Sequence, residues 1–142
     1  MRYFVADPRA VTMDDLRAAF QSVDAKYDLL CEGSIGELLF DGGLYGQVEF
    51  NIPGDGLFDA EIQEHVENAQ YQGTGQVDRV VDLLRSAKAT VCVQVLNQGR
   101  DSDSTLARIA PLWEWLFLNR LGLLHAGGEG YYDEDNLIVE AD

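Results

Sequence analysis

The chain has 142 residues, 46% of them hydrophobic, which is the size and composition of one compact domain with its own core. Its formal net charge is −15, with 25 acidic residues against 10 lysines and arginines. A surface of this charge repels phosphate backbones and anionic lipid headgroups, so we expect neither nucleic acid nor membrane as a partner.

The location of the protein is predicted by what the sequence lacks. No apolar run approaches the roughly 20 residues that a bilayer span requires. The first residues lack the apolar region of a signal peptide, because Asp7 and Pro8 interrupt it. Cys31 and Cys92 lie in apolar strand-like runs, where a cysteine behaves as a small hydrophobic residue. We therefore expect free thiols and a cytoplasmic location.

The acidic charge is unevenly distributed along the chain. No lysine or arginine occurs between Lys26 and Arg79, although this segment is rich in Asp and Glu. A well-solvated surface, suited for example to a salty cytoplasm, explains such a composition. The alternative is that the charge attracts a basic protein partner.

The first half of the chain predicts a helix and a three-stranded meander after a short apolar strand. Thr12 has the position of a helix N-cap, and Asp15 lies three residues on, as in a capping box. Two apolar runs at 29–31 and 35–40 are separated by a glycine turn. Residues 44–52 alternate in polarity, as an antiparallel strand with one wet face does. On this strand Val48, Phe50 and Ile52 should point one way, and Gln47, Glu49 and Asn51 the other.

The second half is richer in helix. Residues 58–69 predict an acidic amphipathic helix, and residues 71–76 a loop in which Thr74 caps a further short helix. Residues 90–96 form a nearly unbroken apolar run, typical of a strand covered on both faces. A long apolar helix follows at 106–118, capped by the acidic and serine residues before it. Three short apolar runs near the end are strand candidates: residues 123–124, 131–132 and 137–139.

These elements predict one α+β domain over residues 1–142. We expect two layers, with the helices packed on a mostly antiparallel sheet. The predicted order of elements is β-α-β-β-β-α-α-β-α-β-β, in which two of the three closing runs count as strands. The sequence contains no internal repeat, low-complexity tract or linker that would divide it.

The predicted elements of the later part of the chain follow one another in a definite order. This order is an acidic helix, the strand at 90–96, a capped long helix, the turn Gly128-Glu129-Gly130-Tyr131-Tyr132 and a closing apolar strand. In this order of elements, roughly the last 90 residues resemble some uncharacterised bacterial α+β domains of unknown function. The resemblance rests on the order alone and on no specific motif. It therefore implies a fold class but no activity and no catalytic residue.

Motifs that carry a known chemistry are absent from the sequence. There is no phosphate-binding glycine loop, no nucleophile elbow, and no paired cysteine or histidine motif. Glu61 and His65 lie four residues apart on a predicted helix and could share a metal ion, but a solvated helix face explains them as well. His125, Glu129, Tyr131 and Asp133 crowd a glycine-rich turn, as an acid–base site or the polar ends of a hairpin would. We predict no cofactor and no metal, and we keep His125, Glu129 and Asp133 as candidate catalytic residues.

The long helix is apolar on two sides. One face carries Leu106, Ile109, Ala110, Trp113, Leu116 and Phe117, which should meet the sheet. Trp115 lies roughly 200° around the helix from Trp113, at about 100° per residue. Such a helix is either enclosed within the protein or offers its second face to another chain. Leu112, Trp115 and Leu118 are therefore candidate residues of a two-fold homodimer interface.

Three functional hypotheses follow. The leading one is a non-enzymatic cytoplasmic module that works by protein association, either with itself as a homodimer or with a basic partner. The second is a small hydrolase or transferase with its site near His125, Glu129 and Asp133. The third is an acidic immunity-type inhibitor that masks a basic toxin.

Overall fold

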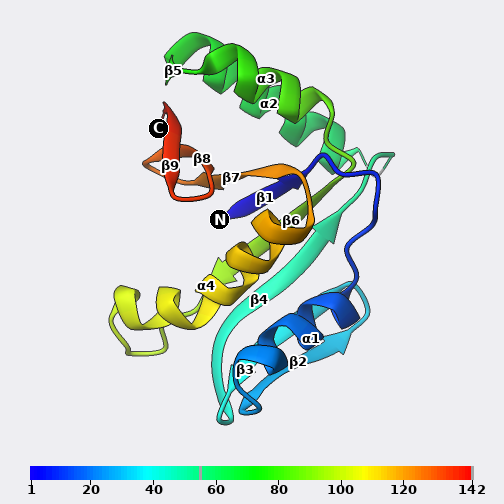
Figure 1. The fold of residues 1–142 in the computed structure, drawn as a ribbon, viewed down its shortest axis with the longest axis vertical. Coiled ribbons are helices and arrows are strands. Elements are labelled where there is room, and N and C mark those ends of the chain that lie inside the picture. Colours follow the sequence, from blue (N-terminus) through cyan, green and yellow to red (C-terminus); the bar gives the residue numbers. More distant parts are fainter. Residues whose placement is uncertain (55, 142) are drawn as a thin grey trace.

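The computed structural model describes residues 1–54 and 56–141 (Figure 1). The strands of these residues are β1 (Arg2–Val5), β2 (Tyr27–Glu32), β3 (Ile35–Phe40), β4 (Gly43–Asn51), β5 (Thr74–Gly75), β6 (Ala89–Val95), β7 (Gly122–Ala126), β8 (Gly130–Asp133) and β9 (Asn136–Glu140). Their helices are α1 (Met13–Val23), α2 (Leu57–Gln72), α3 (Val77–Arg85) and α4 (Ser102–Asn119). The described strands form one sheet in the order β2-β3-β4-β6-β1-β7-β8-β9-β5, and every pairing is antiparallel.

The centre of the sheet is the first strand of the chain. β1 is bonded to β6 on one side and to β7 on the other. Its residues Tyr3, Phe4 and Val5 are each at most 1% exposed. β6 lies inside the sheet between β4 and β1. The predicted cover on both faces is only partly present, because Val91 and Val93 are buried on one face, whereas Gln94 on the other face is exposed.

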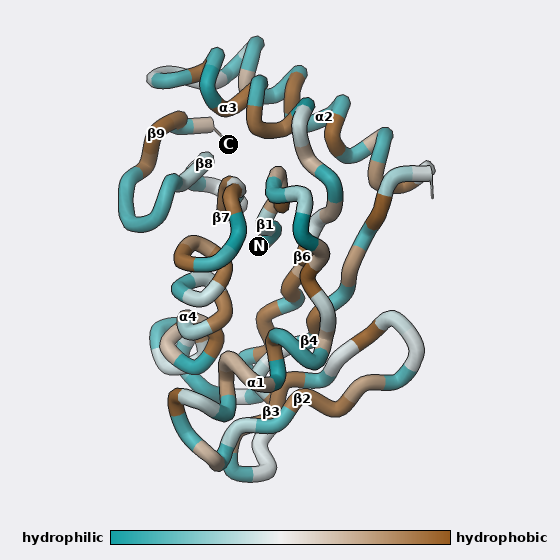
Figure 2. The backbone as a smooth tube through the Cα atoms, turned by 45° about the vertical axis from the view of Figure 1, so that its right-hand side comes forward, coloured by the Kyte–Doolittle hydropathy of each residue, from teal (hydrophilic) through white to brown (hydrophobic). Residues whose placement is uncertain are grey.

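Helices cover both faces of the sheet. α1 and α4 pack on one face, over a core that includes Tyr3 and Val5. α2 and α3 pack on the other face, over a second core that includes Phe4. In Figure 2, apolar and polar segments alternate along α2 and α3. The α+β class and the antiparallel sheet are confirmed, whereas the expected two-layer arrangement is wrong, because β1 is apolar on both sides and needs cover on both.

Two details of the element order also differ from the prediction. All three closing runs form strands, so the chain ends in β7, β8 and β9. Thr74 belongs to β5 and pairs with Glu140, and Gln76 takes the N-cap position of α3 without a side-chain cap bond. Gly75 permits this close pairing, because it has a φ of 118° and a Cβ there would lie 2.3 Å from the Ile138 carbonyl oxygen.

The predicted helix starts are confirmed for α1 and α4. The Thr12 hydroxyl accepts from the Asp15 amide at 3.1 Å, and the Asp15 carboxylate accepts from the Thr12 amide at 3.0 Å. Asp101 caps α4 by accepting from the Ser104 amide at 2.8 Å. In the part of the chain that the structure describes, no helix combines the length and apolar character that a bilayer crossing requires.

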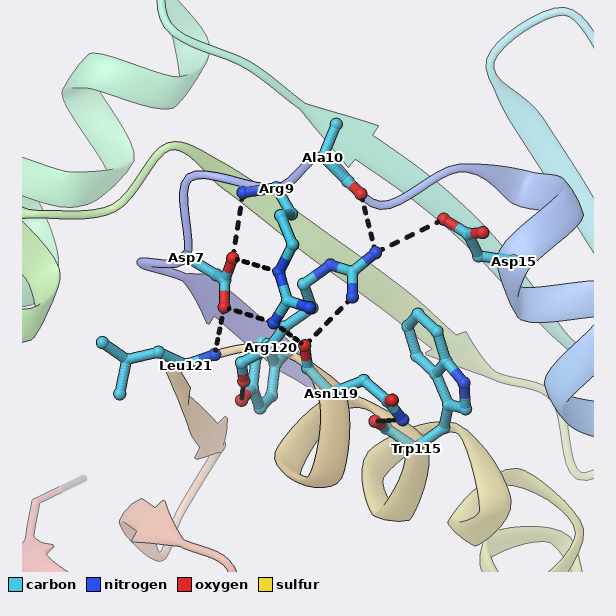
Figure 3. Close-up of polar contacts among 9 residues, drawn as sticks. Asp7, Arg9, Ala10, Asp15, Trp115, Asn119, Arg120 and Leu121 are labelled. Carbon is cyan, nitrogen blue, oxygen red and sulfur yellow. Dashed lines mark hydrogen bonds and ion pairs between the residues drawn. The ribbon is translucent and has the colours of Figure 1, made fainter.

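Two arginines close the C-terminal end of α4 (Figure 3). The Asn119 carbonyl oxygen accepts from Arg9 Nη2 at 2.6 Å and from Arg120 Nη1 at 3.0 Å. Arg120 Nη2 also donates to the Ala10 carbonyl oxygen at 3.0 Å. Cations at this end complement the negative pole of the helix dipole. Arg9 also pairs with Asp7, and this contact holds the pKa of the Asp7 carboxyl well below its usual range.

Candidate functional site

One row of side chains crosses eight strands of the sheet. Consecutive partners in the strand register are Glu32, Ile35, Glu49, Cys92, Arg2, His125, Tyr131 and Val139. Directly opposed residues point to the same side of a sheet, so the whole row lies on the face that carries α2 and α3. These two helices cover only the part of the row on β1, β7, β8 and β9. The row is therefore half covered and half open.

Glu61 of α2 contacts Arg2 in the covered half of this row of side chains. The two side chains form an ion pair, and the Glu61 side chain is 11% exposed. Asn51 Nδ2 donates to Glu61 Oε2 at 3.4 Å and to Cys92 Sγ at 3.5 Å. Asn51 is only 7% exposed, although it lies on the strand face that the sequence predicts to be wet. These contacts of Glu61 determine which side of α2 faces β1.

Two histidines and a tyrosine lie beside this ion pair. The rings of His65 and His125 are in edge contact, with 4.7 Å between their centroids. A hydrogen bond of 2.8 Å joins His65 Nδ1 to the Tyr131 hydroxyl oxygen. His125 is 8% exposed, and its Nε2 has no hydrogen-bond partner among the described residues. The cluster therefore contains one buried polar atom that nothing in the described chain satisfies.

Burial keeps this cluster in its neutral forms. It lowers the pKa of His125 to about 4, with the nearby Arg2 charge acting in the same direction. It also lowers the pKa of His65 to about 4, with His125 and Arg2 as the further causes. Burial raises the pKa of the Cys92 thiol to about 11. At neutral pH both imidazoles are uncharged and the thiol is protonated, so Cys92 does not have the character of a reactive nucleophile.

A pocket of about 630 Å³ runs along α2 at this point. We call it the α2 pocket. Its lining residues are Arg2, Leu57, Ala60, Glu61, Glu64, His65, Glu67, Asn68, Tyr71, Gln72 and His125. The sheet contributes Arg2 and His125, and α2 contributes the others along one of its sides.

The uncovered half of the row belongs to a broader surface on β2, β3 and β4. We call this surface the open sheet face and define it by Leu30, Glu32, Ile35, Glu37, Gln47 and Glu49. Leu30 is 50% exposed and Ile35 is 40% exposed. A shallow hollow of about 400 Å³ lies over this surface. The opposite side of the same strands is buried under α1 and α4.

The three candidate catalytic residues do not come together. His125 lies in the α2 pocket, with Tyr131 as its partner in the strand register. Glu129 is exposed and accepts a hydrogen bond of 3.0 Å from the Tyr132 hydroxyl. Asp133 forms an ion pair with Arg79 and lines a different pocket. The structure brings His125 to His65 instead, so it gives little support to an acid–base site built from His125, Glu129 and Asp133.

The three interface candidates on α4 have different environments. Leu112 is fully buried, so its predicted surface position is wrong, because α1 packs beside α4 and encloses that side. Trp115 is partly buried against the core, and the Arg120 guanidinium lies 5.1 Å from its ring centroid (Figure 3). Leu118 is 85% exposed. Only Leu118 offers a free apolar side chain to another molecule.

The possible metal pair Glu61 and His65 is used within the protein. Glu61 is ion-paired with Arg2, and His65 is bonded to Tyr131. Over residues 1–54 and 56–141, no three His, Cys, Asp or Glu side chains are grouped so that they could hold a metal ion.

Sequence patterns indicate parts of the α2 pocket but not their association. Helical spacing pairs Glu61 with His65, whereas a separate glycine-rich turn groups His125 with Tyr131. Arg2, Glu64 and Tyr71 carried no signal, because nothing in the sequence places them beside a histidine. Comparison of the chain with protein-family models, curated proteins and solved structures finds no match.

Proposed function

We propose that this chain is a non-enzymatic protein-association module that binds a basic partner protein on the open sheet face. The observation that carries the proposal is the composition of this uncovered surface. Leu30 and Ile35 are exposed apolar side chains, and Glu32, Glu37 and Glu49 lie around them. An apolar centre with a charged surround is the usual arrangement of a protein interface.

The charge of the open sheet face is not neutralised within the chain. Among the described residues, none of its three glutamates forms an ion pair. The arginines that do form ion pairs engage other carboxylates: Arg2, Arg9, Arg17, Arg79 and Arg120. The field of this surface therefore attracts a basic partner and speeds its encounter.

The edge of the sheet is less suited to association than its face. β2 is an edge strand, but its Leu29 carbonyl oxygen already accepts from Arg17 Nε at 3.0 Å. Its Tyr27 carbonyl oxygen accepts from Gln21 Nε2 at 3.3 Å. Side chains of α1 thus occupy groups that a further strand would pair with. We assign the partner to the face for this reason.

The cytoplasm is the compartment that we propose for this association. Cys31 and Cys92 are both free thiols, which suits a reducing compartment. A basic toxin that is held inactive by binding is one partner of the proposed class.

Selection from a phage-displayed peptide library tests the proposal. We expect enrichment of peptides that combine lysine or arginine with apolar residues. Leu30→Asp and Glu37→Lys should each weaken the binding of selected peptides about tenfold, as interface-centre changes of about 1.4 kcal/mol do. Both side chains are exposed, so neither change should unfold the protein.

Leu118→Asp is the matched control, because it introduces the same charge on α4, which packs on the other face of the sheet. Its peptide affinities should equal those of the wild type. Selected peptides without basic residues, or peptides that bind Leu30→Asp as well as the wild type, would contradict the proposal.

Self-association is a second candidate, favoured by a different surface. Leu118 is 85% exposed at the end of α4, and Leu121 just beyond it is 62% exposed. This pair replaces the three-residue interface that the sequence predicts on α4.

A further inference from the structure

The α2 pocket is a site in its own right, separate from the open sheet face. It is lined by one side of α2 and by two sheet residues, Arg2 and the buried His125. We propose that this pocket binds a small organic cation that carries a primary ammonium or guanidinium group. The proposal does not depend on the protein-association function.

The charges of the pocket favour a cation. The single positive side chain in its lining is Arg2, which is already paired with Glu61. Glu64 and Glu67 also line the pocket, and neither has a basic partner among the described residues. The two histidines add no charge at neutral pH, because burial lowers the pKa of each to about 4. An anionic ligand would meet two uncompensated carboxylates, whereas a cation is attracted by them.

The buried histidine supplies an unused polar group. His125 is 8% exposed, and its Nε2 has no hydrogen-bond partner among the described residues. A buried polar atom without a partner costs free energy, and a ligand that supplies the missing bond recovers it. A neutral imidazole has one acceptor nitrogen, and ammonium and guanidinium groups consist only of donors. The donor groups of an organic cation thus match an imidazole acceptor.

An exposed aromatic ring stands at the end of the pocket. Tyr71 is 84% exposed and lies on the last turn of α2. A cation over such a ring is attracted by the negative face of its π system. The chain uses this contact elsewhere, since Arg100 lies 3.7 Å from the Tyr45 ring centroid and Arg108 lies 3.6 Å from that of Phe40. The α2 pocket thus contains three kinds of group that can bind an organic cation: carboxylates, an aromatic ring and a neutral imidazole.

Titration with agmatine tests the proposal, because this probe carries both an ammonium and a guanidinium group. The readout is the ring ¹⁵N chemical shifts of His65 and His125, which line the pocket and whose shifts a ligand bound there should change. We expect saturable shifts that weaken with added salt. 1-Pentanol, an uncharged alkyl alcohol, and inorganic phosphate should produce no saturable shift.

Variants at the rim locate the binding. Glu64→Gln and Tyr71→Ala change exposed side chains, so the fold should persist, and each should weaken agmatine binding about threefold. Glu114→Gln is the matched control, since it removes the same charge from an exposed position on α4. Leu30→Asp should also leave agmatine binding unchanged, which separates this site from the open sheet face.

Three results would overturn the proposal. The first is no saturable shift with agmatine, and the second is equal binding of 1-pentanol or phosphate. The third is agmatine binding that Glu64→Gln and Tyr71→Ala leave as strong as in the Glu114→Gln control.

Discussion

His65 of α2 and His125 of β7 lie in edge contact, with 4.7 Å between their ring centroids. The contact joins a helix to a sheet strand that is distant in the sequence. Burial is the main cause that disfavours protonation of both imidazoles, and the nearby Arg2 charge acts in the same direction on each. His125 adds to the effect on His65. In the folded protein, both histidines are therefore neutral at neutral pH.

The histidine pair predicts that the protein loses stability on mild acidification. In the folded chain both pKa values are about 4, below the ordinary value of 6.5. The unfolded chain therefore binds more protons between these values, and the free energy of unfolding falls as the pH is lowered through this window. Each histidine contributes at most about 1.4 kcal/mol per pH unit. Urea unfolding at several pH values between about 7 and about 5 measures the slope.

Protonation of the many surface carboxylates acts in the opposite direction, because it relieves repulsion in a chain of net charge −15. The specific test is therefore the difference between the wild type and His65→Gln, which removes one titrating group of the pair. The variant should show a clearly smaller pH slope. Equal slopes would mean that the two histidines do not behave as a buried neutral pair.

Gly122 is expected to accept no side chain. A Cβ at this position would lie 2.3 Å from the Phe4 carbonyl oxygen and 2.4 Å from the Tyr3 ring. Gly122→Ala should therefore destabilise the protein by about 1–3 kcal/mol or more, as forced overpacking does. Gly127→Ala is the control, because no atom lies within 4 Å of its Cβ position. Thermal unfolding of the two variants compares them, and similar midpoints would contradict the close approach of β1 and β7.

Trp113 should be the most costly side chain to remove from α4. It is 8% exposed and belongs to the core under α1 and α4. Trp113→Ala should lower the free energy of unfolding by about 3–5 kcal/mol, as loss of a large core aromatic residue does. Leu118→Ala, at a position that is 85% exposed, should change it by less than about 0.5 kcal/mol. An unchanged unfolding midpoint for Trp113→Ala would contradict the burial of this side chain under α1 and α4.

Self-association through the end of α4 predicts a dimer that a single charge disrupts. Sedimentation of the wild type at micromolar concentration should show dimers, and Leu118→Glu should sediment as a folded monomer. Repulsion between the acidic chains is screened beyond roughly 8 Å at physiological ionic strength, so the local apolar contact decides the outcome. A wild-type monomer would exclude this interface, and the Leu30→Asp variant controls for association through the open sheet face.

Local sequence patterns predicted the elements of this fold well. The capping box of Thr12 and Asp15 and the cap at Asp101 depend on residues three apart, so the sequence alone indicates them. The prediction failed where a distant segment decides the environment. Asn51 has a polar position in an alternating strand, yet Glu61 and α2 enclose it.

The candidate site was less predictable than the fold. His125 lies opposite Arg2 only because β7 pairs with β1 in one particular register. A shift of that register by one residue would turn His125 to the other face of the sheet. No periodicity in the sequence specifies the partners of β1, so the meeting of His65 and His125 follows from tertiary pairing.

The central position of β1 has a consequence for how this protein is made. Arg2 is synthesised long before its partners in the sheet, because Cys92 and His125 lie far later in the sequence. The β2-β3-β4 meander can pair as soon as it emerges, because its contacts are local. β1 therefore stays unpaired, with Tyr3, Phe4 and Val5 uncovered, until β6 and β7 have been synthesised. An apolar strand in this state is a natural client for a chaperone that binds nascent chains.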